Sequence, residues 1–130
     1  MNTQKQPPEG LTHTIDVVAF LFVQNPHLTG VENITKGRTS EELITLVNYC
    51  AETLENFSVE QLKPFDAYPW ESVLEESWDQ ERAEELGMSV TEFRKNWNLV
   101  YQTLKSNLHD ALLEEAFTRM IRATAPPPSM

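Results

Sequence analysis

A continuous amphipathic pattern of apolar and polar positions runs from Ser89 to about Arg122. Apolar residues recur there at spacings of three and four, the period of one face of an α-helix. No glycine or proline interrupts the span, and Ser89 with Glu92 has the pattern of a capping box that starts a helix. The positions expected to face inward are Phe93, Trp97, Val100, Leu104, Leu108, Ala111, Leu112, Ala116, Phe117, Met120 and Ile121. The pattern predicts one long helix, along which shorter helices or a second chain should pack.

Two earlier segments carry helical patterns with clear boundaries. After Thr39, which suits a helix cap, apolar residues follow at spacings of three and four: Leu43, Val47, Cys50, Leu54 and Phe57. Pro69 suits the first turn of the next helix, because its missing N–H would have no partner there, and Gly87 suits its end. The apolar positions of that helix are Trp70, Val73, Leu74, Trp78 and Leu86.

The run from 12 to 25 is apolar almost throughout and is consistent with either a buried strand or a central helix. We favour the helix, because no second strand-like run is available to pair with it. Residues 26–37 contain two glycines without periodicity and are predicted to form a loop.

These patterns predict an all-α fold, a bundle of about four helices organised around one long C-terminal helix. Residues 11–122 should form a single helical domain, because a chain of 130 residues with 40% hydrophobic content can build one core. A disordered arm at 1–10 and a Pro-rich disordered tail at 123–130 are expected to flank it.

The charge balance restricts the classes of partner. Twenty acidic and ten basic residues give a net charge of −10, which repels nucleic acids and anionic membranes. The longest apolar run, Val17 to Val23, is far shorter than the ~20 residues that span a bilayer, and the first ten residues lack the pattern of a secretory signal. A single cysteine suits a reducing compartment. We therefore expect a cytoplasmic chain whose partner is a protein.

Residues 82–98 resemble the helix-turn-helix signature, in which a small residue, a turn glycine and two apolar residues stand at fixed spacings. The corresponding residues here are Ala83, Gly87, Met88 and Phe93. The run from Glu71 to Glu85 contains seven acids and one base, which would repel a DNA duplex. A structural helix-turn-helix is therefore favoured, and a DNA-binding regulator is kept as an alternative.

Two sets of residues are candidates for a protein interface. Glu71, Glu75 and Asp79 are spaced four apart on the predicted helix, so they should form one acidic face that suits a basic partner or is simply solvated. Trp97 and Tyr101 lie on the long helix, where neighbouring leucines widen the apolar arc beyond one stripe. An arc that wide predicts contacts on two sides, from the bundle and from either a partner or a second copy in a homodimer.

Signals for catalysis or metal binding are weak. The histidines at 13, 27 and 109 lack helical metal-site spacing, and the chain contains neither a phosphate-binding glycine loop nor a nucleophile elbow. Cys50 stands inside an apolar stripe and is expected in the core. The sequence thus favours a small acidic helical protein-interaction or regulatory module, without catalytic activity or a cofactor. An enzyme or ligand-binding bundle with a cryptic site remains an alternative.

Overall fold

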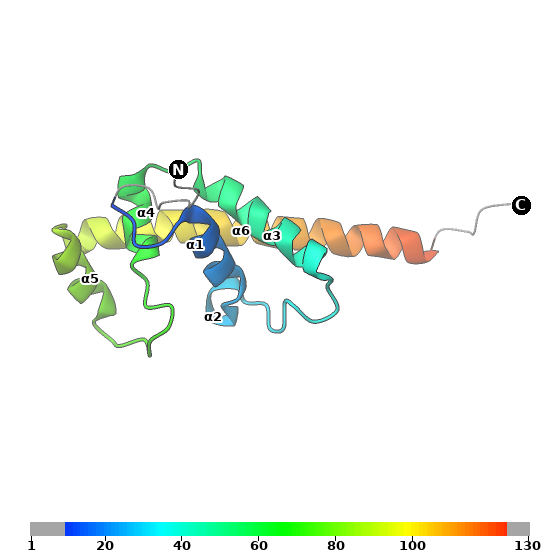
Figure 1. Cartoon of the computed structure of the whole chain (residues 1–130), viewed down its shortest axis with the longest axis horizontal. Coiled ribbons are helices and arrows are strands. Elements are labelled where there is room, and N and C mark those ends of the chain that lie inside the picture. The colour runs from blue at the N-terminus through cyan, green and yellow to red at the C-terminus, as the bar shows by residue number, and fades with distance from the viewer. Residues whose placement is uncertain (1–9, 125–130) are drawn as a thin grey trace, which may run out of the picture.

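The computed structural model describes residues 10–124, and within that range the fold is all-α (Figure 1). The helices are α1 (Ile15–Val23), α2 (Pro26–Thr29), α3 (Ser40–Leu54), α4 (Val59–Asp66), α5 (Trp78–Leu86) and α6 (Val90–Thr124). The shorter helices gather along α6, which runs the length of the molecule. The predicted fold class and the central position of the long C-terminal helix are confirmed.

The long helix begins where its capping pattern predicts. The hydroxyl of Ser89 accepts a hydrogen bond from the backbone N–H of Glu92 at 3.1 Å, which satisfies one of the donors left free at a helix start. The helix ends at Thr124. Its fully buried side chains are Phe93, Val100, Leu104 and Leu108. The predicted arm and tail lie mostly outside the described residues. Only residues 10, 123 and 124 of these two segments are described.

The apolar run near the N-terminus forms a helix, so this preference is confirmed. The hydroxyl of Thr14 caps α1 by accepting the backbone N–H of Val17 at 3.2 Å. Phe22 on α1 is fully buried and α1 packs against α3. The predicted loop that follows begins with the short helix α2, which Asn25 caps and Gly30 ends with a φ of 75°. Glycine suits that position because residues with a Cβ rarely adopt positive φ.

Helix α3 presents the stripe that its sequence pattern predicts. Thr39 and Glu42 form a complete capping box, with hydrogen bonds of 2.9 and 3.1 Å. Cys50 and Leu54 are buried in the core, while Val47 is partly buried at its edge. This part of the predicted core is confirmed.

The buried environment raises the pKa of the Cys50 thiol to about 12, because apolar surroundings disfavour the thiolate. We expect a thiol reagent to label Cys50 slowly in the native protein and quickly in denaturant, since the thiolate is the reactive form. Time courses of labelling with and without guanidinium chloride measure this difference. Native labelling as fast as that of a small free thiol would show that the side chain reaches solvent.

A buried carboxylate joins the N-terminal segment to α4. Asp66 accepts the backbone N–H of Thr12 at 2.7 Å and that of His13 at 3.0 Å, and the His13 imidazole Nδ1 lies 3.1 Å from the same carboxylate. These contacts supply the partners that a buried charge requires. They hold the segment leading into α1 against the end of α4.

The helix predicted from Pro69 to Leu86 is wrong in its first half. Residues 70–77 form an irregular segment, and α5 begins only at Trp78. Val73 is 87% exposed and Leu74 is also exposed, although the apolar pattern placed both on a buried side. The acidic residues spaced four apart in this segment also disfavour a helix, since like charges at that spacing repel.

Tertiary packing explains where the irregular segment ends. The rings of Trp70 and Trp78 both contact the ring of Tyr68, at centroid distances of 4.9 and 5.2 Å. Residues eight apart in a straight helix are separated by about 12 Å along its axis, so a continuous helix would draw the two indoles away from one ring. The stabilisation gained by packing both indoles against Tyr68 favours the irregular conformation of residues 70–77.

Candidate functional site

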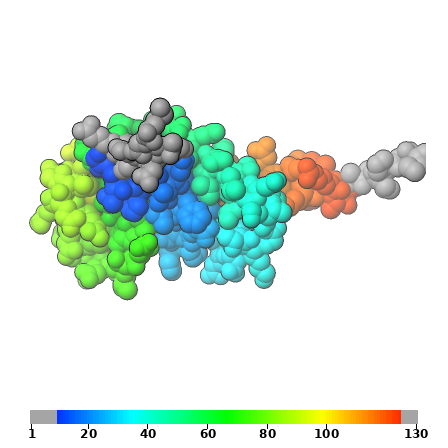
Figure 2. All heavy atoms as spheres, in the orientation of Figure 1, coloured from blue at the N-terminus to red at the C-terminus, as the bar shows by residue number. Residues whose placement is uncertain are grey.

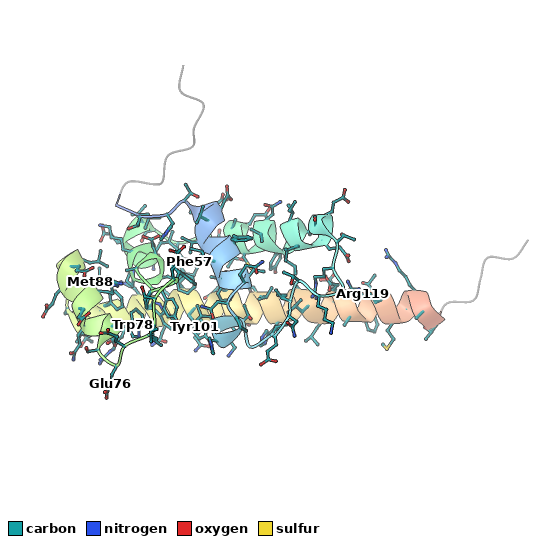
Figure 3. All side chains as sticks on the ribbon, turned by 60° about the horizontal axis from the view of Figure 1, so that its bottom comes forward. Phe57, Glu76, Trp78, Met88, Tyr101 and Arg119 are labelled. Atoms are coloured by element: carbon teal, nitrogen blue, oxygen red, sulfur yellow. The ribbon has the colours of Figure 1, made fainter. Side chains whose placement is uncertain are left out.

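Trp97 and Tyr101 lie side by side in a cluster of aromatic rings. Their rings stack with centroids 4.9 Å apart and an interplanar angle of 27°. The hydroxyl of Tyr101 donates a hydrogen bond to the backbone carbonyl of Leu28 at 3.0 Å, and the ring of Trp97 stacks on that of Tyr68. Figure 3 shows Tyr101 and Trp78 in this region. These contacts join α2 and the end of α4 to α6, so both side chains stabilise the fold, and their use in an interface stays a prediction.

A surface depression of about 260 Å³ opens beside this cluster. Its lining residues are Trp78, Asp79, Phe93, Arg94, Trp97 and Asn98. The buried indole N–H of Trp97 has no hydrogen-bond partner among the described residues. The lining combines aromatic rings with one ion pair, so the depression suits an apolar side chain better than a reaction that needs a nucleophile and a base.

The three acids expected on one helical face are separated in the structure. Glu71 and Glu75 lie in the exposed segment 70–77, whereas Asp79 lies in the first turn of α5. The carboxylate of Asp79 accepts a hydrogen bond from Arg94 Nε at 2.6 Å, and this bond lowers the pKa of Asp79. The prediction that these three acids share one helical face is therefore wrong. A basic partner for the remaining exposed acids stays a prediction.

Helices α5 and α6 have the helix-turn-helix arrangement that residues 82–98 resemble. Ala83 and Phe93 are buried between the helices, and Gly87 takes a φ of 69° at the turn. On the second helix, Arg94 forms an ion pair with Asp79 of the first helix. The pairing of this cation with an acid favours a structural role for the turn over contact with phosphates.

The C-terminal part of α6 carries a second apolar face, which we call the outward stripe. Its residues are Leu113, Phe117, Met120 and Ile121, whose side chains are 69%, 58%, 55% and 49% exposed. The sequence pattern placed the last three, together with Ala116, on the inward side, and the structure shows that all of them are exposed.

The geometry of an α-helix explains the direction of the outward stripe. Leu113 is nine residues from the buried Leu104, and Phe117 is nine residues from the buried Leu108. Nine residues correspond to about two and a half turns, which places two side chains on opposite sides of a helix. The outward stripe therefore faces away from the helices that pack on α6.

Charged residues occupy the inward side of this same part of α6. Glu115 accepts a hydrogen bond from Arg38 at 2.6 Å, and Arg119 donates one to Glu42 at 2.9 Å. The backbone N–H of Thr39 and the Arg119 guanidinium lower the pKa of the Glu42 carboxyl. Figure 3 shows Arg119 beside the beginning of α3. Projecting the sequence on a helical wheel would have revealed this change, because the inward positions become charged after Leu112.

A groove of about 330 Å³ lies between α3 and α6. Thr45, Leu46 and Tyr49 line it from α3, and Ala111, Glu114, Glu115, Thr118, Arg119 and Arg122 line it from α6. Arg122 also borders this groove and is nine residues from Leu113, so it lies on the side of α6 opposite the outward stripe. Figure 2 shows that the end of α6 projects from the body of the molecule.

Comparisons with protein families, curated proteins and solved structures find no match to this chain. Within residues 10–124, no three histidine, cysteine or acidic side chains are grouped so that they would hold a metal ion. In the same range, no helix is both long and apolar enough to cross a bilayer.

Proposed function

We propose that this chain is a small helical protein-interaction module that binds another protein through the outward stripe of α6. The observation that supports this proposal is a row of four large apolar side chains, each about half exposed or more, on one face of a projecting helix end. Contiguous apolar surface of this kind is typical of protein interaction sites, whereas isolated exposed apolar residues are ordinary. No catalytic activity is proposed.

The spacing of the outward stripe supports a helical mode of recognition. Leu113, Phe117, Met120 and Ile121 stand at positions i, i+4, i+7 and i+8. This is the spacing by which an amphipathic helix binds another helix or a groove. Fully burying one such side chain contributes about 1.5–3 kcal/mol. Because about half of each side chain remains to be buried, the stripe supplies on the order of 4 kcal/mol to binding.

The fixed helical conformation of this end of α6 also supports the proposal. The earlier part of α6 is held by the core, and Arg119 ties the later part to α3 through Glu42. A surface that is already helical before binding avoids the entropy cost of ordering a segment. The outward stripe is thus a preformed surface, which favours binding by helix packing.

The replacement of Leu113 by glutamate should abolish partner binding without unfolding the protein, because it places a charge within an apolar contact. We expect at least a tenfold loss of affinity, equivalent to about 1.4 kcal/mol. Capture from a lysate of the source cells, quantified by mass spectrometry, would identify proteins held by wild type. Titration calorimetry with the purified partner would then measure the affinity.

Leu99→Glu provides the matched control. Leu99 is also exposed on α6 but lies outside the outward stripe, so this variant should bind like wild type. Thermal melts of both variants must show a folded protein. Equal retention of partners by Leu113→Glu and Leu99→Glu would contradict the proposed function.

A further inference from the structure

We propose that the partner of the outward stripe is a basic amphipathic helix, whose apolar face is bordered by lysine or arginine along one edge. This inference rests on the proposed function, because both require the stripe to be a contact surface, and it adds the chemical class of the partner. It is carried by two unpaired carboxylates on the same face of α6, and by the position of the arginines on other sides of this helix.

Asp110 and Glu114 lie on the same side of α6 as the outward stripe. Asp110 precedes Phe117 by seven residues, and Glu114 precedes Ile121 by the same number. Seven residues make about two turns of an α-helix, so each carboxylate stands almost in line with the apolar residue that follows it two turns later. Asp110 therefore continues the stripe toward the body of the molecule, and Glu114 borders the edge of the stripe that Ile121 forms.

Both carboxylates are available to a partner's cations. The side chains of Asp110 and Glu114 are exposed, and neither forms an ion pair or a hydrogen bond with another residue of the described range 10–124. The acid on the inward side of this helix end differs, because Glu115 forms ion pairs with Arg38 and Arg119. The unpaired negative charge of this part of α6 is thus on the side of the outward stripe.

The arginines of this part of α6 lie on other sides of the helix. From residue 106 to residue 124, the lysine and arginine positions are Arg119 and Arg122. Arg119 forms an ion pair with Glu42 of α3, and Arg122 is nine residues from Leu113, which places it opposite the stripe. The face that a partner would contact therefore combines large apolar side chains with negative charge and carries no lysine or arginine within residues 106–124.

The apolar side chains supply the affinity of this face, and the two carboxylates select the partner. Exposed ion pairs add little to affinity, but like charges brought together across a contact are repulsive and exclude wrong partners. A second copy of this chain presents the same two acids along its stripe and therefore lacks the complementary edge. A helix with an apolar face and a lysine or arginine edge matches both parts of the surface.

The position of the shorter helices leaves space for one helix along this face. They pack along the earlier part of α6 and on the side opposite the outward stripe, and the end of α6 extends beyond them (Figures 1 and 2). The face from Asp110 to Ile121 extends about 16 Å along the helix axis, so it matches about three turns of a partner helix. Ala116 and Ala123 border the stripe at Met120, on its other edge, so the partner's basic residues are needed on only one edge.

Two synthetic peptides of about 18 residues, long enough to form an isolated helix, test the inference. Both carry the same leucine face. The lysine peptide has lysines along one edge of that face, and the glutamate peptide has glutamates at the same positions. Fluorescence anisotropy of each labelled peptide, titrated with the full chain, measures binding. We expect wild type to bind the lysine peptide at least about fivefold more tightly than the glutamate peptide, and we expect added salt to reduce this preference by screening the exposed charges.

Charge variants of the full chain separate a specific contact from general attraction to a negative protein. Asp110→Asn/Glu114→Gln should remove the preference for the lysine peptide, and Asp110→Lys/Glu114→Lys should reverse it. Glu81→Lys/Glu84→Lys is the matched control, because it changes the net charge by the same amount at two exposed positions of α5. This control should keep the lysine preference of wild type. Phe117→Ala should weaken binding of the lysine peptide without changing any charge.

Several results would overturn the inference. They are a wild type that does not bind the lysine peptide or binds both peptides equally, a preference that both Asp110/Glu114 variants retain, and binding that Phe117→Ala leaves unchanged. Sedimentation equilibrium of wild type alone tests a second copy as the occupant, and a dimer that Leu113→Glu dissociates would also overturn the inference. After any of these results, the proposed function still stands if wild type captures partners that Leu113→Glu loses, so the two failures are distinguishable.

Discussion

Replacing Phe65 with alanine should lower the free energy of unfolding by about 3–5 kcal/mol, the range for a fully buried phenylalanine. Its ring is fully buried and contacts the rings of Phe22, Trp70 and Trp97, at centroid distances of 6.0, 5.5 and 5.8 Å. The substitution therefore opens a cavity where α1, α4 and α6 meet. Urea denaturation followed by circular dichroism measures the change.

Phe117→Ala is the matched control for this experiment. It makes the same change in the outward stripe, where the side chain is exposed, so at low protein concentration the free energy of unfolding should change by less than about 0.5 kcal/mol. The substitution should instead weaken binding through the outward stripe. An equal loss of stability in the two variants would contradict the assignment of Phe117 to the surface.

Leu54→Ala should lower the free energy of unfolding by about 2–5 kcal/mol, because Leu54 is fully buried between α3 and the other helices of the core. Val47→Ala on the same helix should cost less, since Val47 is only partly buried and loses fewer atoms. Urea denaturation curves of the two variants give the comparison.

Ile44→Ala serves as the surface control, because Ile44 is exposed on the other side of α3. This variant should remain close to wild type in stability. A loss below about 1 kcal/mol for Leu54→Ala, outside the range for buried leucines, would mean that the predicted stripe of α3 faces solvent.

Local signals were sufficient for the helical class and for several helix boundaries. Capping residues such as Thr39 and Ser89 act on backbone groups within their own helix turn, so their effect can be recognised without knowledge of distant residues. Gly87 ends α5 for a reason that is equally local, the positive φ of its backbone. The spacing of the apolar residues was by itself enough to predict the buried stripe of α3.

The irregular segment 70–77 depended on contacts outside its own sequence. Its apolar residues have helical spacing, but Trp70 and Trp78 pack on Tyr68, which lies outside the segment. Likewise, Asp79 pairs with Arg94, fifteen residues later on another helix. The predicted acidic face was lost because these tertiary contacts outweighed the weak local preference for a helix.

The sequence alone determined that α6 is a long amphipathic helix, because apolar spacing and the absence of glycine and proline are properties of the segment itself. Only the tertiary structure decided which apolar residues the other helices cover. After Leu112 the side facing α3 is taken by Glu115 and Arg119, whose partners Arg38 and Glu42 come from distant parts of the chain. Those ion pairs leave Phe117 and its neighbours facing solvent, and local periodicity contains no information about where such partners lie.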